Sequence, residues 1–169
     1  MTLFILSAAS GVGKTTVKDE LLRRSPAFAC VDADQVGLRW SDYAGTERED
    51  DYRSDTLRAA AAAAGGRDML FATCLNPLDY FRSVAPPEEI TRTFFIGMVC
   101  RDEDLPPRLK ARPPEYGCGG DDFIKAQIDY NNWFRRNRGK FQLFVDNTGQ
   151  TAEETADIVG GFISRVLGY

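Results

Sequence analysis

A short stretch close to the N-terminus has the residue types that bind phosphate. The apolar run Leu3–Ser7 leads into a segment with two glycines, followed by a lysine and two threonines. Glycine lets a backbone curl so that successive N–H groups point at one anion, and a helix starting at Lys14 would add its positive dipole end. We therefore predict a phosphate site made by seven consecutive residues: Ser10, Gly11, Val12, Gly13, Lys14, Thr15 and Thr16.

The order of these residues is that of a P-loop, in which Lys14 reaches the β- and γ-phosphates and the Thr15 hydroxyl is a ligand of Mg²⁺. The sequence departs from the motif at Ala8, where the motif has its first glycine. Residues 2–16 closely resemble the opening of guanylate kinases. The segment rich in Ser, Thr and Arg that follows in that family is missing here. The resemblance therefore implies a phosphoryl-transfer fold and not GMP as the substrate.

Two carboxylates, Asp32 and Asp34, follow the second apolar run. In an extended segment, residues two apart point the same way, so both can face the phosphate site. We expect Asp32 to hold Mg²⁺ or its waters together with Thr15, and Asp34 to accept the proton of an acceptor hydroxyl or to anchor it. The pair resembles the Asp-x-Asp of shikimate kinases, although that family's Gly-rich segment after the third strand is absent. The alternative is that one Asp caps the next helix.

Basic residues follow the fourth apolar run, in a segment that contains prolines. Pro107 suits a helix start and Pro113 ends the helix. Arg108 and Arg112 are four residues apart, so they share one face of it. They resemble the lid arginines of gluconate, shikimate and nucleoside monophosphate kinases. The resemblance implies that residues 101–120 form a lid that closes over the phosphates and stabilises charge during transfer. The alternative is a solvated charged helix.

The turn after the last apolar run has a different expected role. Thr151 and Glu154 have the spacing of a capping box, which marks the start of the last helix. In small P-loop kinases the turn at this place typically wraps the adenine. The resemblance suggests that Asn147, Thr148 and Gly149 line the base, although most of this signal is turn chemistry.

The phosphoryl acceptor should bind between the segment that follows Asp34 and the end of the third strand. Aromatic side chains can stack on a base there, and arginines can hold a phosphate or a carboxylate. The candidates are Arg39, Trp40, Tyr43, Arg53 and Asn76. Packing in the core is the alternative for Trp40 and Tyr43. No acidic residue ends the third strand, so a Walker-B carboxylate is not evident there and Asp32 gains importance as a metal ligand.

Five apolar runs and the helical patterns between them must position these residues. The expected strands are Leu3–Ser7, Phe28–Val31, Met69–Thr73, Thr93–Val99 and Gln142–Val145. The expected helices are Lys14–Arg24, Glu47–Ala64, Pro77–Val84, Asp121–Asn137 and Ala152–Leu167. Nearly continuous apolar runs are typical of strands buried on both faces of a parallel sheet. Their alternation with helices predicts a three-layer α/β/α P-loop NTPase fold with a five-stranded parallel sheet and a small lid.

The length and composition fit one globular domain, with 43% hydrophobic and 27% charged residues. Together with the motifs and the resemblance, this predicts a single P-loop kinase domain over residues 1–169. The sequence has no His, which excludes Ser–His and Cys–His nucleophile systems and His-ligated zinc. Its four cysteines fit no zinc spacing, so we expect reduced thiols. A net charge of −4 disfavours nucleic acid as a partner. No apolar run approaches the ~20 residues of a membrane span, and we expect a cytoplasmic protein with no membrane partner.

These observations predict an ATP- and Mg²⁺-dependent kinase that acts on a small-molecule phosphoryl acceptor. The expected catalytic residues are Lys14, Asp34, Arg108 and Arg112. A nucleoside or a nucleoside monophosphate is the first expected acceptor, and a non-nucleotide hydroxyl, of a sugar acid or an antibiotic, is the next. A 5′-hydroxyl polynucleotide kinase is disfavoured by the net charge, and a regulatory nucleotide-binding module by the missing Walker-B carboxylate. Monomer and homodimer both remain open.

Overall fold

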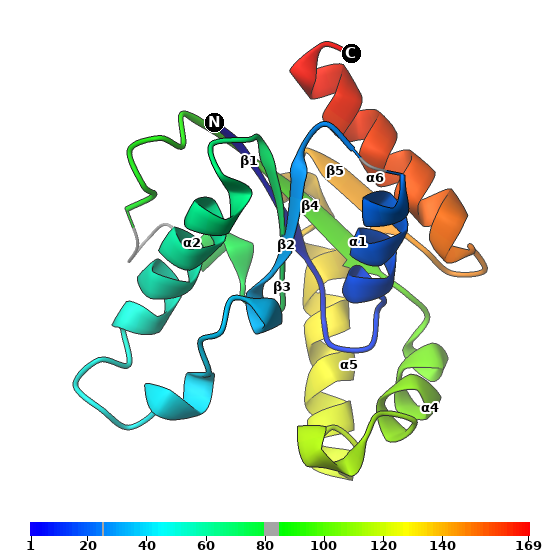
Figure 1. Cartoon of the computed structure of the whole chain (residues 1–169). Helices are drawn as coiled ribbons and strands as arrows, with labels where there is room; N and C mark the ends of the chain where they lie inside the picture. Colours follow the sequence, from blue (N-terminus) through cyan, green and yellow to red (C-terminus); the bar gives the residue numbers. More distant parts are fainter. Residues whose placement is uncertain (25, 80–84) are drawn as a thin grey trace.

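The computed structural model describes residues 1–24, 26–79 and 85–169 and contains one parallel sheet (Figure 1). Its strands are β1 (Thr2–Ser7), β2 (Ala29–Asp32), β3 (Met69–Thr73), β4 (Arg92–Val99) and β5 (Leu143–Asp146). They lie in the order β2-β3-β1-β4-β5, and each neighbouring pair is parallel. Strand order changes direction on either side of β1, so the segment after β1 lies at the switch point where α/β proteins bind ligands. The predicted fold class is confirmed.

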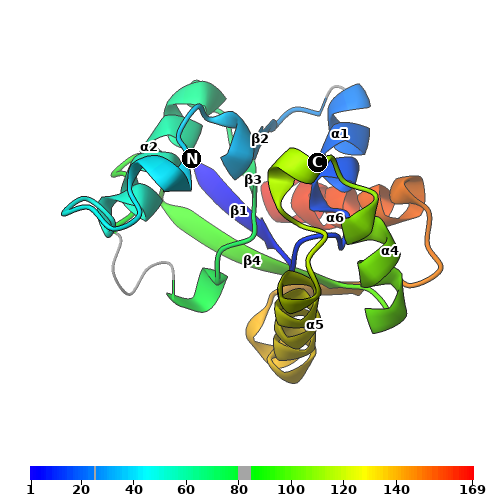
Figure 2. The ribbon, with the colours of Figure 1, turned by 90° about the horizontal axis from the view of Figure 1, so that it is seen from below.

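Helices cover both faces of this sheet. They are α1 (Lys14–Arg23), α2 (Asp51–Ala64), α4 (Leu105–Lys110), α5 (Asp121–Arg136) and α6 (Ala152–Leu167). Short 3₁₀ turns connect them to the strands: η1 (Ala33–Gln35), η2 (Trp40–Asp42), η3 (Asp102–Asp104), η4 (Pro114–Tyr116) and η5 (Arg138–Lys140). Seen from the carboxyl ends of the strands, α1 and α6 lie on one side of the sheet and α2 and α5 on the other (Figure 2).

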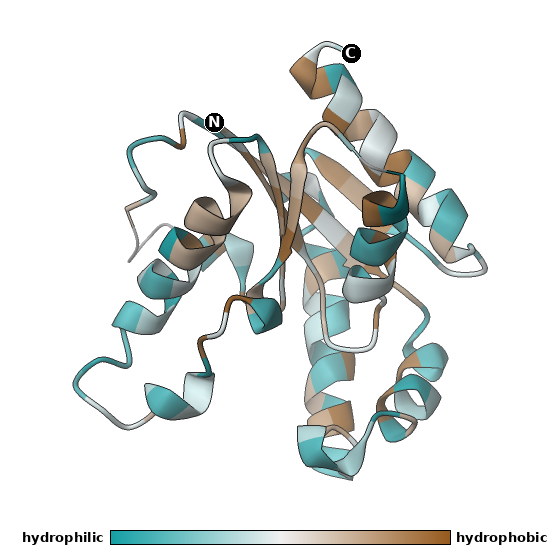
Figure 3. Ribbon diagram, viewed as in Figure 1, coloured by the Kyte–Doolittle hydropathy of each residue, from teal (hydrophilic) through white to brown (hydrophobic). Residues whose placement is uncertain are grey.

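Alternating side chains of β1 build the two cores between these layers. Phe4 and Leu6 pack in the cluster that includes α1 and α6, whereas Leu3 and Ile5 pack in the cluster that includes α2. All four are fully buried, as expected for a central parallel strand. The hydropathy colouring shows mostly apolar residues along the strands and more hydrophilic residues in the surrounding helices and turns (Figure 3).

Three helix predictions differ from the structure. The helix predicted from Glu47 begins at Asp51, because the residues before it form turns in which Thr46 and Glu49 bond to nearby backbone groups. The helix predicted between Pro107 and Pro113 begins earlier, at Leu105, since the first turn of a helix has free N–H groups and tolerates proline. It also ends earlier, at Lys110, so Arg112 lies in the turn after it and does not share a helix face with Arg108. Of the helix predicted over 77–84, residues 77–79 are helical and residues 80–84 lie outside the described part of the chain.

All five strands end at the same edge of the sheet, where the segments named in the sequence analysis gather. The P-loop segment follows β1, the two aspartates end or follow β2, and the lid segment follows β4. Among the residues that the structure describes, no helix is both long enough and apolar enough to cross a membrane.

Candidate active site

The phosphate loop joins β1 to α1 by residues 8–13. Gly11 and Gly13 have φ values of 86° and 111°, a region that side chains rarely adopt, so glycine is required at both places. A Cβ on Gly11 would also lie 3.1 Å from the Leu109 side chain, which places the loop directly against α4. Ala8, the departure from the motif, is fully buried in the core beside the loop.

Lys14 lies inside the loop rather than in solvent. Its Nζ donates hydrogen bonds to the carbonyl oxygens of Ala8 and Ala9, at 2.9 and 3.0 Å. The side chain is 8% exposed. Both partners are neutral carbonyls, so no carboxylate is paired with this side chain in the loop. The structure therefore places Lys14 at the loop in which the sequence predicts a phosphate site.

Thr15 and Asp32 form a pair of oxygen donors next to the loop. The Thr15 hydroxyl donates to Asp32 Oδ2 at 3.0 Å, and Asp32 Oδ1 accepts the Asp34 N–H at 3.1 Å. Asp32 thus caps η1 and also touches Thr15, so the capping alternative and the proposed metal contact involve the same carboxylate. No group of three His, Cys, Asp or Glu residues suited to a metal occurs in the described ranges. The pair nevertheless fits Mg²⁺, which keeps waters and substrate phosphates as further ligands.

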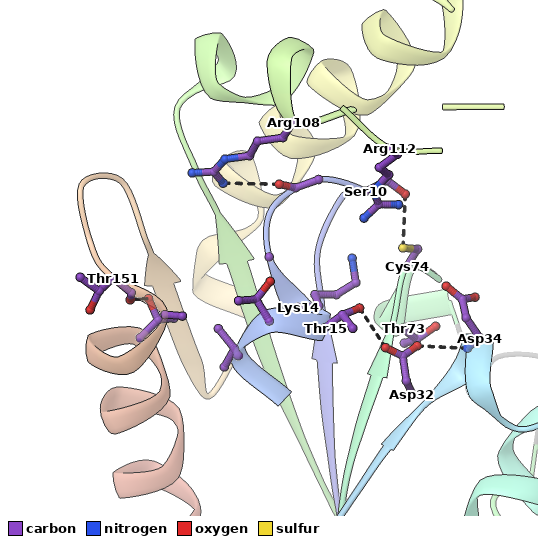
Figure 4. Close-up of a pocket in the computed structure, with 16 residues that line it drawn as sticks. Ser10, Lys14, Thr15, Asp32, Asp34, Thr73, Cys74, Arg108, Arg112 and Thr151 are labelled. Atoms are coloured by element: carbon purple, nitrogen blue, oxygen red, sulfur yellow. Dashed lines mark hydrogen bonds between the residues drawn. The ribbon is translucent and has the colours of Figure 1, made fainter. Parts of the chain in front are cut away.

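Asp34 lies between the cationic side chains and the acceptor side. Partial burial, and then the negative charge of Asp32, raise the pKa of the Asp34 carboxyl, while Lys14 and Arg112 act in the opposite direction. Asp34 lines two adjoining cavities, together with Thr73 and Cys74. The close-up shows its carboxylate beside Cys74, across from Lys14 and Thr15 (Figure 4).

The first of these cavities, of about 340 Å³, contains the phosphate loop. Its lining combines the loop with residues from α1, β2, β3, α4 and the start of α6: Ser10, Gly11, Gly13, Lys14, Thr15, Thr16, Val17, Asp32, Asp34, Thr73, Cys74, Arg108, Arg112, Thr151, Ala152 and Thr155. Val12, the remaining member of the predicted loop, is buried, and its carbonyl accepts hydrogen bonds from Asn147 and Arg108.

The two predicted lid arginines both reach the first cavity. Arg108 Nη1 lies 3.4 Å from the Gly11 carbonyl oxygen and 3.5 Å from that of Val12, so this side chain rests on the loop. Arg108 also pairs with Asp104 at 3.9 Å. Arg112 enters the lining from the turn after α4. The structure therefore brings both guanidinium groups to the phosphate loop.

The turn after β5 supports the loop from its other side. Asn147 Nδ2 donates to the Val12 carbonyl at 2.8 Å. Asn147 Oδ1 and Thr148 Oγ1 are buried without a hydrogen-bond partner among the described residues. Gly149 has a φ of 74° and forms the turn before the capping box of Thr151. None of the three predicted adenine contacts lines the first cavity, whereas Thr151 does.

The second cavity, of about 560 Å³, receives two of the five predicted acceptor residues. Trp40 and Arg53 line it. Tyr43 does not, because it is buried and packs on Tyr52, with its hydroxyl donated to Asp55 at 3.0 Å. The packing alternative therefore describes Tyr43.

Arg39 and Asn76 also lie outside the linings of both cavities. Arg39 is exposed at the start of η2. Asn76 accepts the Leu78 N–H at 3.0 Å and donates to Asp79 at 2.8 Å, so it caps the turn that begins at Pro77. Capping is a common use of Asn at a helix start and explains this residue without an acceptor.

Several lining residues were missed from the sequence. Thr73 ends β3 and Cys74 follows it, and their position at the carboxyl end of a parallel strand is the signal that could have found them. Glu49 and Asp50 line the second cavity from the turns before α2. The helix predicted from Glu47 included both, and its pattern did not indicate that they face a cavity. Gln127 of α5 accepts the Ser10 N–H at 2.8 Å, a long-range contact that no motif predicts.

Solved structures with a similar fold include the following three. The tunicamycin resistance protein of Deinococcus radiodurans is 15% identical, with a TM-score of 0.61, and the match covers 99% of this chain and 95% of that one. Shikimate kinase from Aquifex aeolicus vf5 is 17% identical, with a TM-score of 0.57 and coverage of 99% and 100%. A gluconokinase from Sinorhizobium meliloti 1021 is 17% identical, with a TM-score of 0.60 and coverage of 98% and 94%.

The fold is that of small P-loop kinases. By sequence, the chain matches no family model and no curated protein. The motifs resemble those of small P-loop kinases, and the fold supports that resemblance. The more specific resemblance to nucleoside monophosphate kinases is not supported.

Proposed function

We propose that the protein is an ATP- and Mg²⁺-dependent kinase that transfers the γ-phosphoryl group to a hydroxyl of a small molecule. The observation that supports the proposal best is that Asp34 lines both cavities, so the two adjoin at this residue. One cavity contains the phosphate loop and the other an aromatic wall, so a donor and an acceptor bound there would share one boundary. Bringing the reacting atoms together in this way is a large part of what a kinase must do.

On the donor side, the chain's own residues bind and neutralise phosphate. The loop N–H groups and Lys14 would hold the β- and γ-phosphates. Arg108 and Arg112 would contact the transferred group from the lid segment 101–120 as negative charge shifts. Thr15 and Asp32 are placed to hold Mg²⁺, which when bound neutralises phosphate charge.

On the acceptor side, Asp34 would take the proton of the attacking hydroxyl. It is the carboxylate that lines both cavities without serving as a cap, and its raised pKa makes it a better proton acceptor than an ordinary Asp. Since the sequence has no His, a carboxylate is the natural base. The phosphoryl group would cross from the first cavity to the second past this residue.

The nucleoside part of ATP would lie toward the turn after β5. The buried, unpartnered Asn147 Oδ1 and Thr148 Oγ1 leave acceptor capacity near the loop. Thr151 and Thr155 extend the first cavity in the same direction. Reaching Asn147, Thr148 and Gly149 requires a small movement of this turn, because the three do not line the cavity as it stands.

A hydroxyl acceptor has more support than the nucleoside monophosphate first expected. The described lining of the second cavity supplies one guanidinium, Arg53, since Arg39 lies outside it. Two of the neighbouring folds are named a shikimate kinase and a gluconokinase, names that belong to small-molecule kinases. A nucleoside, rather than its monophosphate, remains within the proposal.

Labelled phosphate transfer tests this function. The protein is incubated with γ-labelled ATP and Mg²⁺, with single small acceptors, with a 5′-hydroxyl oligonucleotide, and with no acceptor. We expect label on a small hydroxyl compound. Label on the oligonucleotide end, or phosphate release that no small acceptor changes, would contradict the proposal.

A further inference from the structure

The second cavity has an excess of negative charge among its described lining residues. Asp34, Glu49 and Asp50 contribute carboxylates, and Arg53 contributes the opposing charge. The lining of the first cavity has an excess of positive charge, because it contains Lys14, Arg108 and Arg112 against two aspartates, Asp32 and Asp34. The boundary between the cavities therefore separates a cationic side, suited to phosphates, from an anionic side.

A rigid aromatic surface forms one wall of the anionic side. The Trp40 side chain is 49% exposed, although its ring packs edge-on against Tyr52 at 5.3 Å. Tyr52 in turn packs against buried Tyr43 at 5.2 Å, and Tyr43 is tied to Asp55. Trp40 is thus held against Tyr52 while about half of its surface stays exposed. This arrangement suits a side chain on which a ring can stack and not a core residue.

The negative charge of Asp34 acts on the aromatic wall of the second cavity. Burial first, and the negative charge of Asp34 second, raise the pKa of the Tyr52 hydroxyl. Glu49 Oε2 accepts the Gly45 N–H at 2.6 Å, which fixes the position of this carboxyl group. The negative charge of the cavity is therefore built into its walls.

We propose that the acceptor is a ring compound that carries hydroxyl groups and no anionic group, stacked on Trp40 with its hydroxyls toward the carboxylates. The inference rests on the proposed kinase function and narrows its substrate class. Carboxylates accept hydrogen bonds from hydroxyl and ammonium groups, so neutral and cationic rings are both favoured. An acceptor with a carboxylate or phosphate would face like charges, a common means of rejecting a wrong ligand.

The electrostatic part of the proposal can be measured without knowing the acceptor. The chain has two tryptophans, so a Trp133→Phe variant reports the fluorescence of Trp40 alone. Its quenching by caesium and by iodide is compared at constant ionic strength, each relative to N-acetyltryptophanamide. We expect the caesium-to-iodide ratio to exceed that of the free compound by roughly threefold, because a negative site concentrates cations.

The matched variant adds Glu49→Gln and Asp50→Asn to Trp133→Phe, which keeps size and hydrogen bonding but removes two charges. We expect its ratio to fall toward that of the free compound. A Trp40→Phe variant gives the signal of Trp133 as the control for a distant site. A ratio at or below the free value in the parent, or no change in the charge-removed variant, would overturn the proposal.

Transfer assays then compare acceptors that share a ring and differ in charge: glucosamine, glucose and glucuronate, and cytidine with its 5′-monophosphate. Within any set that is phosphorylated, we expect kcat/KM for the anionic member to be at least about tenfold lower, the size of one unfavourable charge contact. Preference for the anionic member would overturn the inference and leave the kinase function standing. Absence of transfer to every hydroxyl compound would count against the kinase function, while the quenching result would still decide the charge of the cavity.

Discussion

Asp34 is the residue at which the two cavities meet. Its carboxylate lines both cavities, and its pKa responds to Lys14 and Arg112. Replacing it by Asn keeps its shape and removes the charge. We predict that Asp34→Asn lowers kcat for a hydroxyl acceptor by roughly 10²- to 10⁴-fold, as expected for loss of a general base, with ATP binding nearly unchanged.

Steady-state kinetics and nucleotide titration measure these two quantities for Asp34→Asn. Asp129→Asn on the exposed side of α5 is the matched control, since it removes one carboxylate far from either cavity. A variant with unchanged kcat and a raised acceptor KM would instead identify Asp34 as a binding group. Unchanged values of both would leave it a residue of η1 without a chemical role.

Gly11 couples the phosphate loop to the lid. Its φ of 86° disfavours any side chain, and a Cβ there would press on Leu109 at 3.1 Å. We predict that Gly11→Ala lowers the free energy of unfolding by about 1 kcal/mol or more and weakens ATP binding. Urea unfolding and nucleotide titration check this, with Gly139→Ala as control because an added Cβ at Gly139 meets nothing within 4 Å. Equal behaviour of the two variants would contradict the coupling.

At the scale of elements, α4 and the turn after it bring two arginines to the phosphate loop, and the apolar side of α4 anchors this helix in the core. Leu105 and Leu109 are fully buried, and Arg108 and Arg112 line the first cavity. A lid engages most strongly in the reacting state, so its loss should affect kcat more than ATP affinity. We predict this pattern for Arg108→Ala and for Arg112→Ala, measured against Arg136→Ala on α5. Weaker ATP binding with unchanged kcat would place these arginines outside the reacting state.

A polar cluster joins the base of this lid segment to α5. Asp102 of η3 accepts hydrogen bonds from Asn131 and Asn132 at 2.8 Å each and from Arg135 at 2.7 Å. Asn131 and Arg135 also donate to the Cys100 carbonyl. Burial raises the pKa of Asp102, but the bonds from Arg135, Asn132 and Asn131 outweigh it and hold the pKa below its usual value.

The direction of this pKa shift sets a pH dependence. The folded chain prefers the Asp102 carboxylate more than the unfolded chain does, so the stabilisation is present above the unfolded pKa of about 3.9. It is lost as the pH falls through the lower folded pKa. We predict that Asp102→Asn reduces the free energy of unfolding at pH 7 and that its difference from the wild type shrinks toward pH 3. A difference that stays constant with pH would contradict the charged form of the cluster.

For the whole molecule, the sheet and the place of the loop between β1 and α1 could be predicted because their signals are local. Runs such as Leu3–Ser7 are apolar throughout, which marks strands buried on both faces, and the P-loop is a contiguous motif. Arg108 and Arg112 could be placed near the loop because the segment after β4 starts at the same edge of a parallel sheet as the loop after β1, although α4 ends before Arg112. Element ends were less certain, as at Asp51, where turn hydrogen bonds delay the helix.

The lining of the second cavity could be predicted only in part, because several of its residues belong to the irregular segment before α2. Trp40, Asp50 and Arg53 come together by the packing of η2 against the start of α2. No helix or strand is predicted over residues 36–46, so the sequence offers no reason to distinguish Tyr43 from Trp40. Which tyrosine or tryptophan enters the core depends on partners such as Tyr52, and that choice is made by tertiary contacts.

The central claim, that this arrangement is a phosphoryl-transfer site, is tested most directly at Lys14. Its Nζ is held by loop carbonyls in the position from which it would contact the β- and γ-phosphates. We predict that Lys14→Ala lowers transfer from labelled ATP to the best acceptor by on the order of 10²-fold or more. Lys125→Ala, which removes an exposed lysine of α5, should keep wild-type transfer, and circular dichroism should be the same for both. Near wild-type transfer by a folded Lys14→Ala protein would contradict the account.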